Sequence, residues 1–381
     1  NKLIETQDEV KIVSKGIISK TLIKLGMKYP KEIIPKLIFS LNSKNSDVLL
    51  NITTTLDGLY EKFPQKIDLE QIISILNQPI KINIKKEVVQ LISRASKTAP
   101  QMIKPFISEI ISSLPHQDST IINILLRSLL ELVKNEPGLI PARKIIALFD
   151  NKEPLIQESL VKLLGYTGTE DSNFTVDFLV NNTLKNDDWI VRNAAILSIG
   201  NILKNVINQD LVVERLISLL DDNNNWVQKS TMDLLSKLHN IKPSQIPLEK
   251  ITNNMKSKDA KIREGCAQLL KIHVEEDLEN TLDNFIILFG DQSKEVRYTA
   301  IDIVVKIIKK IGISKMFSKL LKNLSDEVPI ETQQSIAIIL GRTLRYGEES
   351  AKKRAISLLK IRCEVSQDPI ICENLTKLKE S

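Results

Sequence analysis

The sequence predicts an all-α chain that folds as a right-handed superhelix of about ten helical hairpins. Three observations carry this prediction. An aliphatic residue that opens a helix recurs every 34 to 38 residues, a residue able to cap a helix stands three positions before it in most copies, and a second aliphatic residue follows it by eight positions. Self-similarity at this period is typical of helical repeat proteins, in which each unit packs only on its neighbours.

The spacing of the aliphatic residues defines the units. We call the residue that opens each of these helices the anchor. The anchors are Val10, Val48, Ile84, Ile121, Ile156, Val191, Val227, Ile262, Val296 and Ile330. Because they extend over most of the 381 residues, the sequence predicts a single solenoid over residues 1–381.

Small polar residues mark where the anchored helices begin. In six units the third residue before the anchor is Asn, Asp or Ser, namely Asn45, Asp118, Asp188, Asn224, Asp259 and Ser293. Side chains of these types accept hydrogen bonds from the free N–H groups of a first helical turn. We therefore expect each anchored helix to start beside its polar residue.

A column of aliphatic residues predicts the core. Eight positions after the anchors stand Ile18, Leu56, Ile92, Leu129, Leu164, Ile199, Leu235, Leu270, Val304 and Ile338. About two helical turns separate the columns, so both face one side of the helix. Further apolar stretches, such as 33–41 and 282–289, precede the anchors. Pro30 and Pro100 lie where these preceding helices would begin, and Pro is tolerated in the first turn of a helix. Each unit is therefore expected to be an A helix, a turn and a B helix.

The clearest units share a pattern with a known family. Residues 186–203, 258–270 and 292–304 each combine a polar cap, Val or Ile followed by Arg, small residues and then aliphatic ones. This pattern resembles the HEAT repeat of armadillo-like α-solenoids, which is found in importin-β, adaptins and condensin subunits. The resemblance covers nearly the whole chain and is closest over residues 176–310.

The resemblance also implies a role for the repeated Asp and Arg residues. In HEAT repeats they form hydrogen-bond ladders between units. The matching residues here are Asp188, Arg192, Asp259, Arg263 and Arg297. The first four units lack the Arg and have Lys11, Leu49, Lys85 and Ile122 instead. The amino-terminal half therefore departs further from the family pattern.

The ends of the chain are expected to be incomplete. The sequence opens within a B helix that has no A helix before it, and its first residue is not Met, so we expect the polypeptide to extend upstream. Residues 364–381 are expected to form a terminal stub or a cap, because a solenoid needs a polar surface at its end.

Few residues suit catalysis or metal binding. His116, His239 and His273 fall in different units without a second ligand at metal-binding spacing, and no phosphate-binding or nucleophile-elbow motif is present. The stretch from Gly165 to Gly168 is expected to connect two helices and to provide a helix C-cap. We expect no catalytic activity, no metal and no cofactor.

The cysteines indicate a reducing compartment. Cys266, Cys363 and Cys372 form an odd, sparse set without CxxC spacing, which predicts neither a disulfide framework nor a zinc site. Cys266 falls among small residues and is expected to fill the core. No run of about 18 apolar residues occurs, so no transmembrane segment is expected. These features favour a cytoplasmic location.

Two tryptophans are candidate partner contacts. Trp189 and Trp226 precede their anchors by two residues and one residue. One interpretation is that each fills the groove between stacked units. The other is that they form an exposed aromatic pair that binds a partner, since Trp is enriched at binding hot spots.

Charge is unevenly distributed along the chain. Residues 1–146 have a net charge of +7, residues 147–293 of −7 and residues 294–362 of +8. The candidate partner-binding residues of the last segment are Lys309, Lys310, Arg342, Arg345, Lys352, Lys353 and Arg354. Such a segment suits acidic proteins, anionic lipid headgroups or nucleic-acid phosphates, although it also fits an ordinary solvated face.

These features favour a scaffold or adaptor that binds proteins along its B helices, in trafficking or in complex assembly. This hypothesis rests on the fold class alone. Two alternatives remain: a nucleic-acid- or chromatin-associated HEAT subunit that uses the basic ends, and a regulatory subunit of an enzyme complex.

Overall fold

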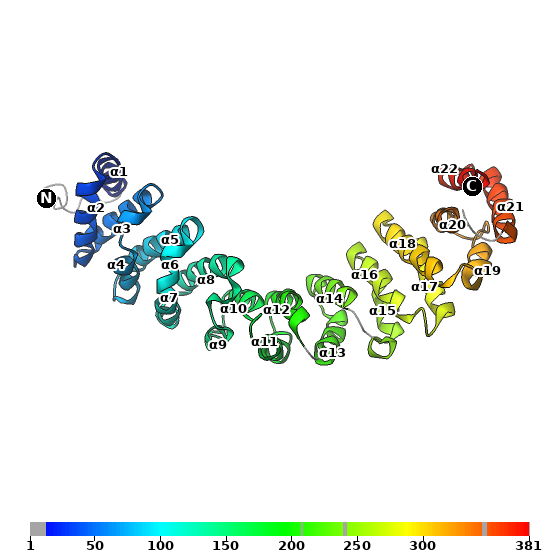
Figure 1. Ribbon diagram of the computed structural model, residues 1–381, viewed down its shortest axis with the longest axis horizontal. Helices are drawn as coiled ribbons and strands as arrows, with labels where there is room; N and C mark the ends of the chain where they lie inside the picture. Colours follow the sequence, from blue (N-terminus) through cyan, green and yellow to red (C-terminus); the bar gives the residue numbers. More distant parts are fainter. Residues whose placement is uncertain (1–12, 207–208, 239–241, 345–348, 381) are drawn as a thin grey trace. The chain divides into compact units, whose positions relative to one another are not determined.

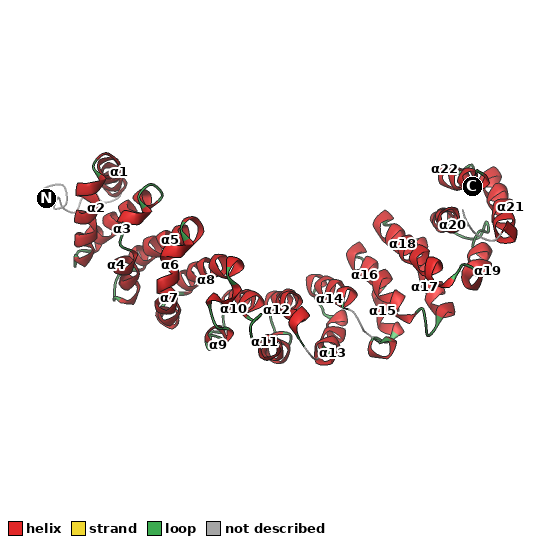
Figure 2. Ribbon diagram, viewed as in Figure 1, coloured by secondary structure: helices red, strands yellow, loops and turns green. Residues whose placement is uncertain are grey.

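The computed structural model describes residues 13–206, 209–238, 242–344 and 349–380, and all regular structure in these ranges is helical (Figure 2). The all-α prediction is thus confirmed. The chain divides into two compact units, Asn1–Asn208 and Gln209–Ser381, which we call unit 1 and unit 2. None of the described helices is long and apolar enough to cross a membrane.

Unit 1 is a stack of helical hairpins, in which the B helices pack on one another in chain order (Figure 1). Its B helices are α1 (Val13–Lys28), α3 (Ser46–Tyr60), α5 (Ile82–Thr98), α8 (Ser119–Asn135), α10 (Pro154–Thr167) and α12 (Trp189–Ile202). Its A helices are α2 (Pro30–Phe39), α4 (Leu69–Ser74), α6 (Pro100–Ile103), α7 (Ile107–Ser113), α9 (Ala142–Ile146) and α11 (Ser172–Phe178).

Unit 2 repeats the same arrangement. Its B helices are α14 (Asn225–Lys237), α16 (Ala260–Leu270), α18 (Lys294–Ile311), α20 (Ile330–Thr343) and α22 (Pro369–Lys379). Its A helices are α13 (Asp210–Ser218), α15 (Leu248–Asn254), α17 (Leu278–Phe289), α19 (Ser314–Lys322) and α21 (Glu349–Ser366). Residues 364–381, expected to be a stub or cap, thus include the end of α21 and all of α22, which pack together as a hairpin.

The core follows the aliphatic columns. Eight residues of the column after the anchors are at most 1% exposed: Leu56, Ile92, Leu129, Leu164, Ile199, Leu235, Leu270 and Val304. Seven anchors are equally buried: Ile84, Ile121, Ile156, Val191, Val227, Ile262 and Val296. Val48 and Ile330 are only half-buried, and Val10 lies outside the described residues.

The burial pattern of α20 differs from the one expected. Thr332 is buried where the anchor Ile330 is not. Pro329 occupies the N-cap position of α20. Because Pro has no N–H to donate, it is tolerated at a helix start and not within a helix, so α20 begins only after it. The buried face therefore starts two residues later than the anchor spacing predicts.

Five of the turns between A and B helices are closed by a side chain in the same way. The residue after the anchor donates a hydrogen bond of 2.6–2.9 Å to the backbone carbonyl six residues earlier, in Gln157, Arg192, Gln228, Arg263 and Arg297. The residues that provide these carbonyls also accept, through their side chains, a hydrogen bond from the N–H two positions later: Asn151, Asn186, Asp222, Ser257 and Asp291. This polar column was not singled out in the sequence, although its residue types are typical of such turns.

Five of the six predicted caps are formed. Asn45, Asp118, Asp188, Asn224 and Asp259 each accept a hydrogen bond from a backbone N–H of the first turn. Ser293 stands at the N-cap of α18, but no side-chain cap bond forms there. Its hydroxyl donates instead to Glu295 at 2.7 Å. The Ser293 hydroxyl is therefore bonded to the glutamate and does not cap the helix.

One buried ion pair joins two successive turns of unit 2. Arg263 donates from Nε and Nη2 to the two carboxylate oxygens of Asp291 at 2.6 and 2.8 Å. Their side chains are only 7% and 8% exposed. Burial raises the pKa of Asp291, but hydrogen bonds from Arg263 and from the Ser293 N–H outweigh it and lower the pKa. Asp259, which also caps α16, pairs with Lys229 at 2.5 Å.

Gly165 corrects an expectation. It lies inside α10 and not in a connection between helices. A Cβ atom added there would stand 2.7–3.0 Å from the side chain and Cα of Ser198 on α12. Gly165 therefore lets two B helices of unit 1 approach closely. Gly168 does stand at the C-cap of α10.

Candidate partner-binding groove

A groove opens on the B helices of unit 2. It has a volume of about 800 Å³ and is lined by residues of α18, α20 and α22. Helix α20 packs on α18 on one side and on α22 on the other, so it forms the middle of the groove (Figure 1). We call this feature the unit 2 groove.

In the middle of the groove, α22 approaches α20 closely. A Cβ atom on Gly341 would lie 2.6 Å from Oδ1 of Asn374. Asn374 is buried, and its amide donates to the backbone carbonyl of Ile370 at 2.8 Å. Ile338 belongs to the core column, yet it is 8% exposed. The groove thus reaches the aliphatic core at this point.

Helix α18 provides the most basic side of the groove. Tyr298, Asp302, Val305, Lys306 and Lys309 line it. Their spacing of three or four residues places them on one face of the helix. Lys306 and Lys309 are exposed, and neither forms an ion pair with any residue that the structure describes.

The other charged side chains of the groove form two ion pairs. Arg342 of α20 donates from Nη1 to Oδ1 of Asp302 at 2.6 Å. On α22, Lys377 pairs with Glu373 at 2.5 Å. Both pairs are partly exposed, so each is weak and can exchange with an incoming charged group. Because these two pairs are internally balanced, the two lysines of α18 determine the net charge of the groove.

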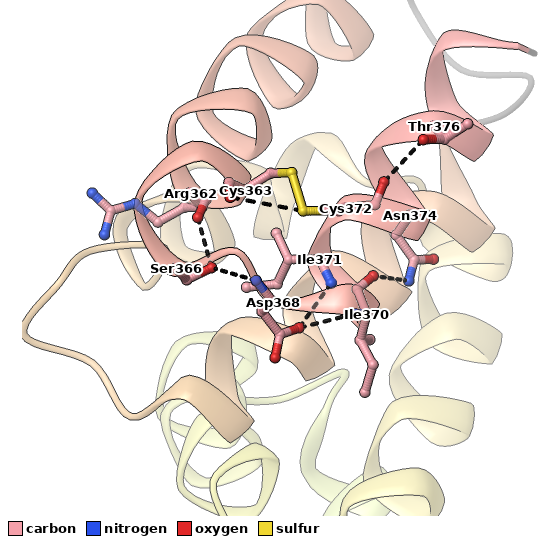
Figure 3. Close-up of a disulfide and its surroundings, with 9 residues drawn as sticks. All are labelled: Arg362, Cys363, Ser366, Asp368, Ile370, Ile371, Cys372, Asn374 and Thr376. Atoms are coloured by element: carbon pink, nitrogen blue, oxygen red, sulfur yellow. Dashed lines mark hydrogen bonds between the residues drawn. A yellow bond between two sulfur atoms is a disulfide. The ribbon is translucent and has the colours of Figure 1, made fainter.

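The α22 side of the groove is attached to α21 by a disulfide. Cys363 and Cys372 form an S–S bond with a Cα–Cα distance of 5.1 Å (Figure 3). Between them, Asp368 caps α22 by accepting hydrogen bonds from the N–H groups of Ile370 and Ile371, both at 3.0 Å. The bond and the cap therefore fix the start of α22.

This disulfide contradicts the expectation from the cysteine count. The spacing of nine residues matches no common motif, but a tight turn between two antiparallel helices brings Cys363 and Cys372 together. Gln367 takes the left-handed backbone conformation, with φ 52°, that lets the chain reverse. The cysteine argument for a reducing compartment thus no longer holds. Cys266 is buried and free.

The predicted basic residues do not all meet in one place. Lys309 and Arg342 line the groove. Lys310 instead pairs with Glu275 at 2.7 Å. Lys352, Lys353 and Arg354 lie on α21 and do not line the groove, and the Arg354 guanidinium stands 5.7 Å from the centre of the Phe317 ring. Arg345 lies outside the described residues.

Several groove residues were missed by the sequence reasoning. Lys377, Glu373 and Asn374 belong to residues 364–381, which were expected to be a stub or cap. A signal for α22 existed, since Asp368 stands three residues before the buried Ile371, which repeats the cap-and-anchor spacing.

The two tryptophans are exposed to different degrees. Trp189 opens α12 of unit 1 and is 37% exposed. Trp226 lies in the first turn of α14 of unit 2 and is 60% exposed. The Lys229 ammonium stands 4.9 Å from the centre of the Trp226 ring, which is a cation–π distance.

Other candidate sites offer less chemistry. Unit 1 has a cavity of about 410 Å³ beside α8 and α10, lined mainly by aliphatic side chains, with Asp150 and Asn151 as polar members. No group of three or more His, Cys, Asp or Glu residues suited to a metal occurs within the described ranges. His273 is buried, and His239 lies outside the described residues. The unit 2 groove is therefore the candidate site.

Comparison with known proteins identifies the fold. No protein-family model matches the chain, and no curated protein matches it. Among solved structures, Kap121p bound to RanGTP aligns with a TM-score of 0.56 and 13% identity, over 96% of this chain and 42% of Kap121p. Kap121p bound to Pho4p aligns with a TM-score of 0.52 and 13% identity, over 96% of this chain and 43% of Kap121p.

A mutant of Kap121p gives a TM-score of 0.53 with 14% identity, over 95% of this chain and 43% of the mutant. The chain therefore spans about two fifths of the length of Kap121p. At this identity the likeness concerns the fold alone. It confirms an all-α superhelical repeat fold, similar to that of Kap121p.

Proposed function

We propose that the chain is a non-enzymatic scaffold that binds a partner protein, with an extended segment of the partner lying in the unit 2 groove. The observation that supports this most directly is an open groove of about 800 Å³ across three successive B helices. A long, open groove of this kind suits a segment of polypeptide, because such a segment can follow the row of helices.

The fold adds support at a coarser level. Kap121p has a similar fold, and its structures contain the protein partners RanGTP and Pho4p. Roles as an adaptor in trafficking or in complex assembly belong to the same proposal. Binding to nucleic acid has less support, because Arg342 and Lys377 are already paired with carboxylates and, of the described cations in the groove, only Lys306 and Lys309 are left to neutralise phosphates.

A labelling experiment tests docking in the groove. A Lys309→Cys variant is modified with fluorescein maleimide without reductant, so that the buried Cys266 and the Cys363–Cys372 disulfide stay unmodified. The labelled and unlabelled proteins then serve as bait in an extract of the source cells, and mass spectrometry quantifies the recovered proteins. We expect the unmodified chain to recover a discrete partner, the unlabelled variant to recover less of it because one groove lysine is missing, and the labelled variant to recover none.

Lys310→Cys is the matched control. Lys310 is the next residue of α18, but it pairs with Glu275 and does not line the groove. Labelled Lys310→Cys should therefore recover the same partner as the unlabelled protein. Equal recovery by labelled Lys309→Cys would show that the partner does not occupy the groove, and recovery of no discrete protein by unlabelled bait would contradict the scaffold proposal itself.

A further inference from the structure

The unit 2 groove combines unpaired positive charge with an apolar surface. Lys306 and Lys309 are both exposed, lie one helical turn apart and have no ion-pair partner within the described ranges. Two ammonium groups on one helix face repel each other, and an anionic ligand placed between them removes this repulsion. The charge on this side of the groove is thus complementary to carboxylates.

The apolar part of the groove lies next to these lysines. Val305 on α18 and Ile338 on α20 are largely buried but still line the groove, and Ile370 of α22 is half-buried. A ligand that covered them would remove apolar surface from water, which favours binding. A purely polar anion would leave this surface wet. The groove therefore suits a ligand that carries both anionic and apolar groups.

We propose that the unit 2 groove binds an acidic, extended peptide segment of the partner, whose carboxylates pair with Lys306 and Lys309 and whose apolar side chains cover Ile370 and the exposed edges of Val305 and Ile338. The proposal rests on the proposed function, because it names the chemistry of the segment that the scaffold binds. In an extended segment, alternate side chains point to opposite sides and neighbours on one side lie about 7 Å apart, so side chains of one segment can reach both α18 and α20.

The same residues argue against a nucleic-acid strand. A strand carries one negative charge per nucleotide along its whole length. Among the described residues of the groove, only the cations Lys306 and Lys309 lie outside ion pairs, because Arg342 and Lys377 are already paired with carboxylates. A peptide can match this pattern by placing carboxylates opposite the two lysines and neutral side chains opposite the ion pairs. The mixed charges of the groove thus favour a protein partner.

Fluorescence anisotropy with short labelled probes tests the proposal on the whole purified chain. The probes are a peptide of alternating Glu and Leu, the same peptide with Gln in place of Glu, the same peptide with Lys in place of Glu, and oligothymidylate. We expect the Glu–Leu peptide to bind, with each of the other three weaker by about tenfold or more, because steering and pairing of carboxylates are lost.

Charge-reversed variants locate the binding. The double variant Lys306→Glu/Lys309→Glu should weaken binding of the Glu–Leu peptide by about tenfold or more. Lys310→Glu/Lys353→Glu is the matched control, since it changes the net charge equally on α18 and α21 but outside the groove. The control should bind the peptide within about twofold of the unmodified chain, because long-range charge effects are largely screened at physiological salt. Circular dichroism confirms that both variants are folded.

Three results would overturn the proposal: no binding of the Glu–Leu peptide, equal loss of binding in both double variants, or tighter binding of oligothymidylate. These outcomes are separate from failure of the scaffold proposal. If fluorescein at position 309 abolishes recovery of the partner but charge reversal leaves its binding unchanged, the groove binds a partner and only the acidic character of the segment is wrong.

Discussion

The buried pair of Arg263 and Asp291 shows how much a single residue can contribute in this chain. Asp291 accepts two hydrogen bonds from Arg263 and one from the Ser293 N–H, while its own backbone carbonyl accepts from Arg297. One residue therefore joins the turns before α16 and α18. Because the pair is buried, removing one partner leaves the other charged and poorly solvated.

Replacing Asp291 by Asn should lower the stability of unit 2 by about 3 kcal/mol at neutral pH, since Arg263 loses its counter-charge. The effect should depend on pH. The folded pKa of Asp291 is below its ordinary value, so its contribution is complete at neutral pH and is lost as the pH falls through that lowered pKa. Urea unfolding followed by circular dichroism measures the difference.

The exposed pair Lys377–Glu373 provides the comparison for this effect. Glu373→Gln removes an ion pair between neighbouring turns of α22, and it should cost less than about 1 kcal/mol. A similar loss in both variants at pH 7, or a constant loss for Asp291→Asn down to pH 2, would contradict the role assigned to Asp291.

Thiol reactivity is a second property that a single residue determines. Burial raises the pKa of Cys266 to about 12, so almost no thiolate forms at neutral pH. With Cys363 and Cys372 paired, we expect the native protein to react with no equivalent of a thiol reagent such as DTNB. Denaturation without reductant should expose one thiol, and denaturation after reduction should expose all three. Rapid reaction of one thiol in the native protein would contradict the burial of Cys266.

At the scale of helices, close approach at glycines determines how tightly the B helices stack. Gly165 in α10 faces Ser198 in α12, including its backbone Cα. An added methyl group would need the helices to separate. The Gly165→Ala variant should therefore lose about 1–3 kcal/mol of stability, measured as the free energy of unfolding in urea.

Gly16→Ala is the matched control for this helix contact. Gly16 lies inside α1, and an added Cβ would have nothing within 4 Å. The same substitution there should stabilise the chain by about 0.5–1 kcal/mol, because Ala favours a helix more than Gly does. Stabilisation by both substitutions would show that α10 and α12 can move apart without loss.

The disulfide is expected to stabilise helix α22 as a whole. By closing a loop of this length, the disulfide lowers the conformational entropy of the unfolded chain. In the chain-entropy description this stabilises the folded state by about 2–3 kcal/mol. A Cys363→Ser/Cys372→Ser variant should therefore show faster amide hydrogen exchange in α22, while α16 should exchange as before. Reductant should reproduce the effect in the unmodified chain but change nothing further in the variant. Exchange in α22 that is the same with and without the bond would show that packing on α20 alone holds the helix.

At the scale of the whole molecule, each helical hairpin of a repeat fold packs only on its neighbours. We therefore expect the effect of a mutation to stay local. Ile92 of α5 is fully buried among B helices of unit 1. Ile92→Ala should cost about 2–5 kcal/mol, because it leaves a cavity. Hydrogen exchange should accelerate in α3, α5 and α8 and stay unchanged in α20 and α22, since stability in repeat proteins is transmitted between neighbours. Uniform acceleration along the chain would contradict this description.

The repeat could be predicted from the sequence because its chemistry is local. Anchors, caps and the aliphatic column lie within about a dozen residues of one another, so helical geometry alone relates them. The period misplaces the buried face of α20, where Pro329 delays the helix start, and in α3 Leu49 is buried in place of the anchor Val48. The fold class and most of the core therefore follow from pattern alone.

The candidate groove could not be predicted in the same way. Lys309 and Arg342 were singled out by charge, but Asn374 and Lys377 come from α22, 65 and 68 residues after Lys309 and 32 and 35 residues after Arg342. Their placement depends on how α21 and α22 pack. Cys363 and Cys372 likewise meet only because the chain reverses at Gln367. Tertiary packing provides these juxtapositions, and no motif in the sequence records them.

The side chains that close the A–B turns also limit where the chain can be lengthened. From Gln157 to Arg297, five donors each reach a carbonyl six positions earlier. One inserted amino acid inside such a turn would move the donor away from this carbonyl, and the loss should be largest where the donor side chain is buried, at Gln157, Arg192 and Arg263. Grafted epitopes, tags or reporter domains placed in these five turns should therefore be poorly tolerated, whatever their own folding properties.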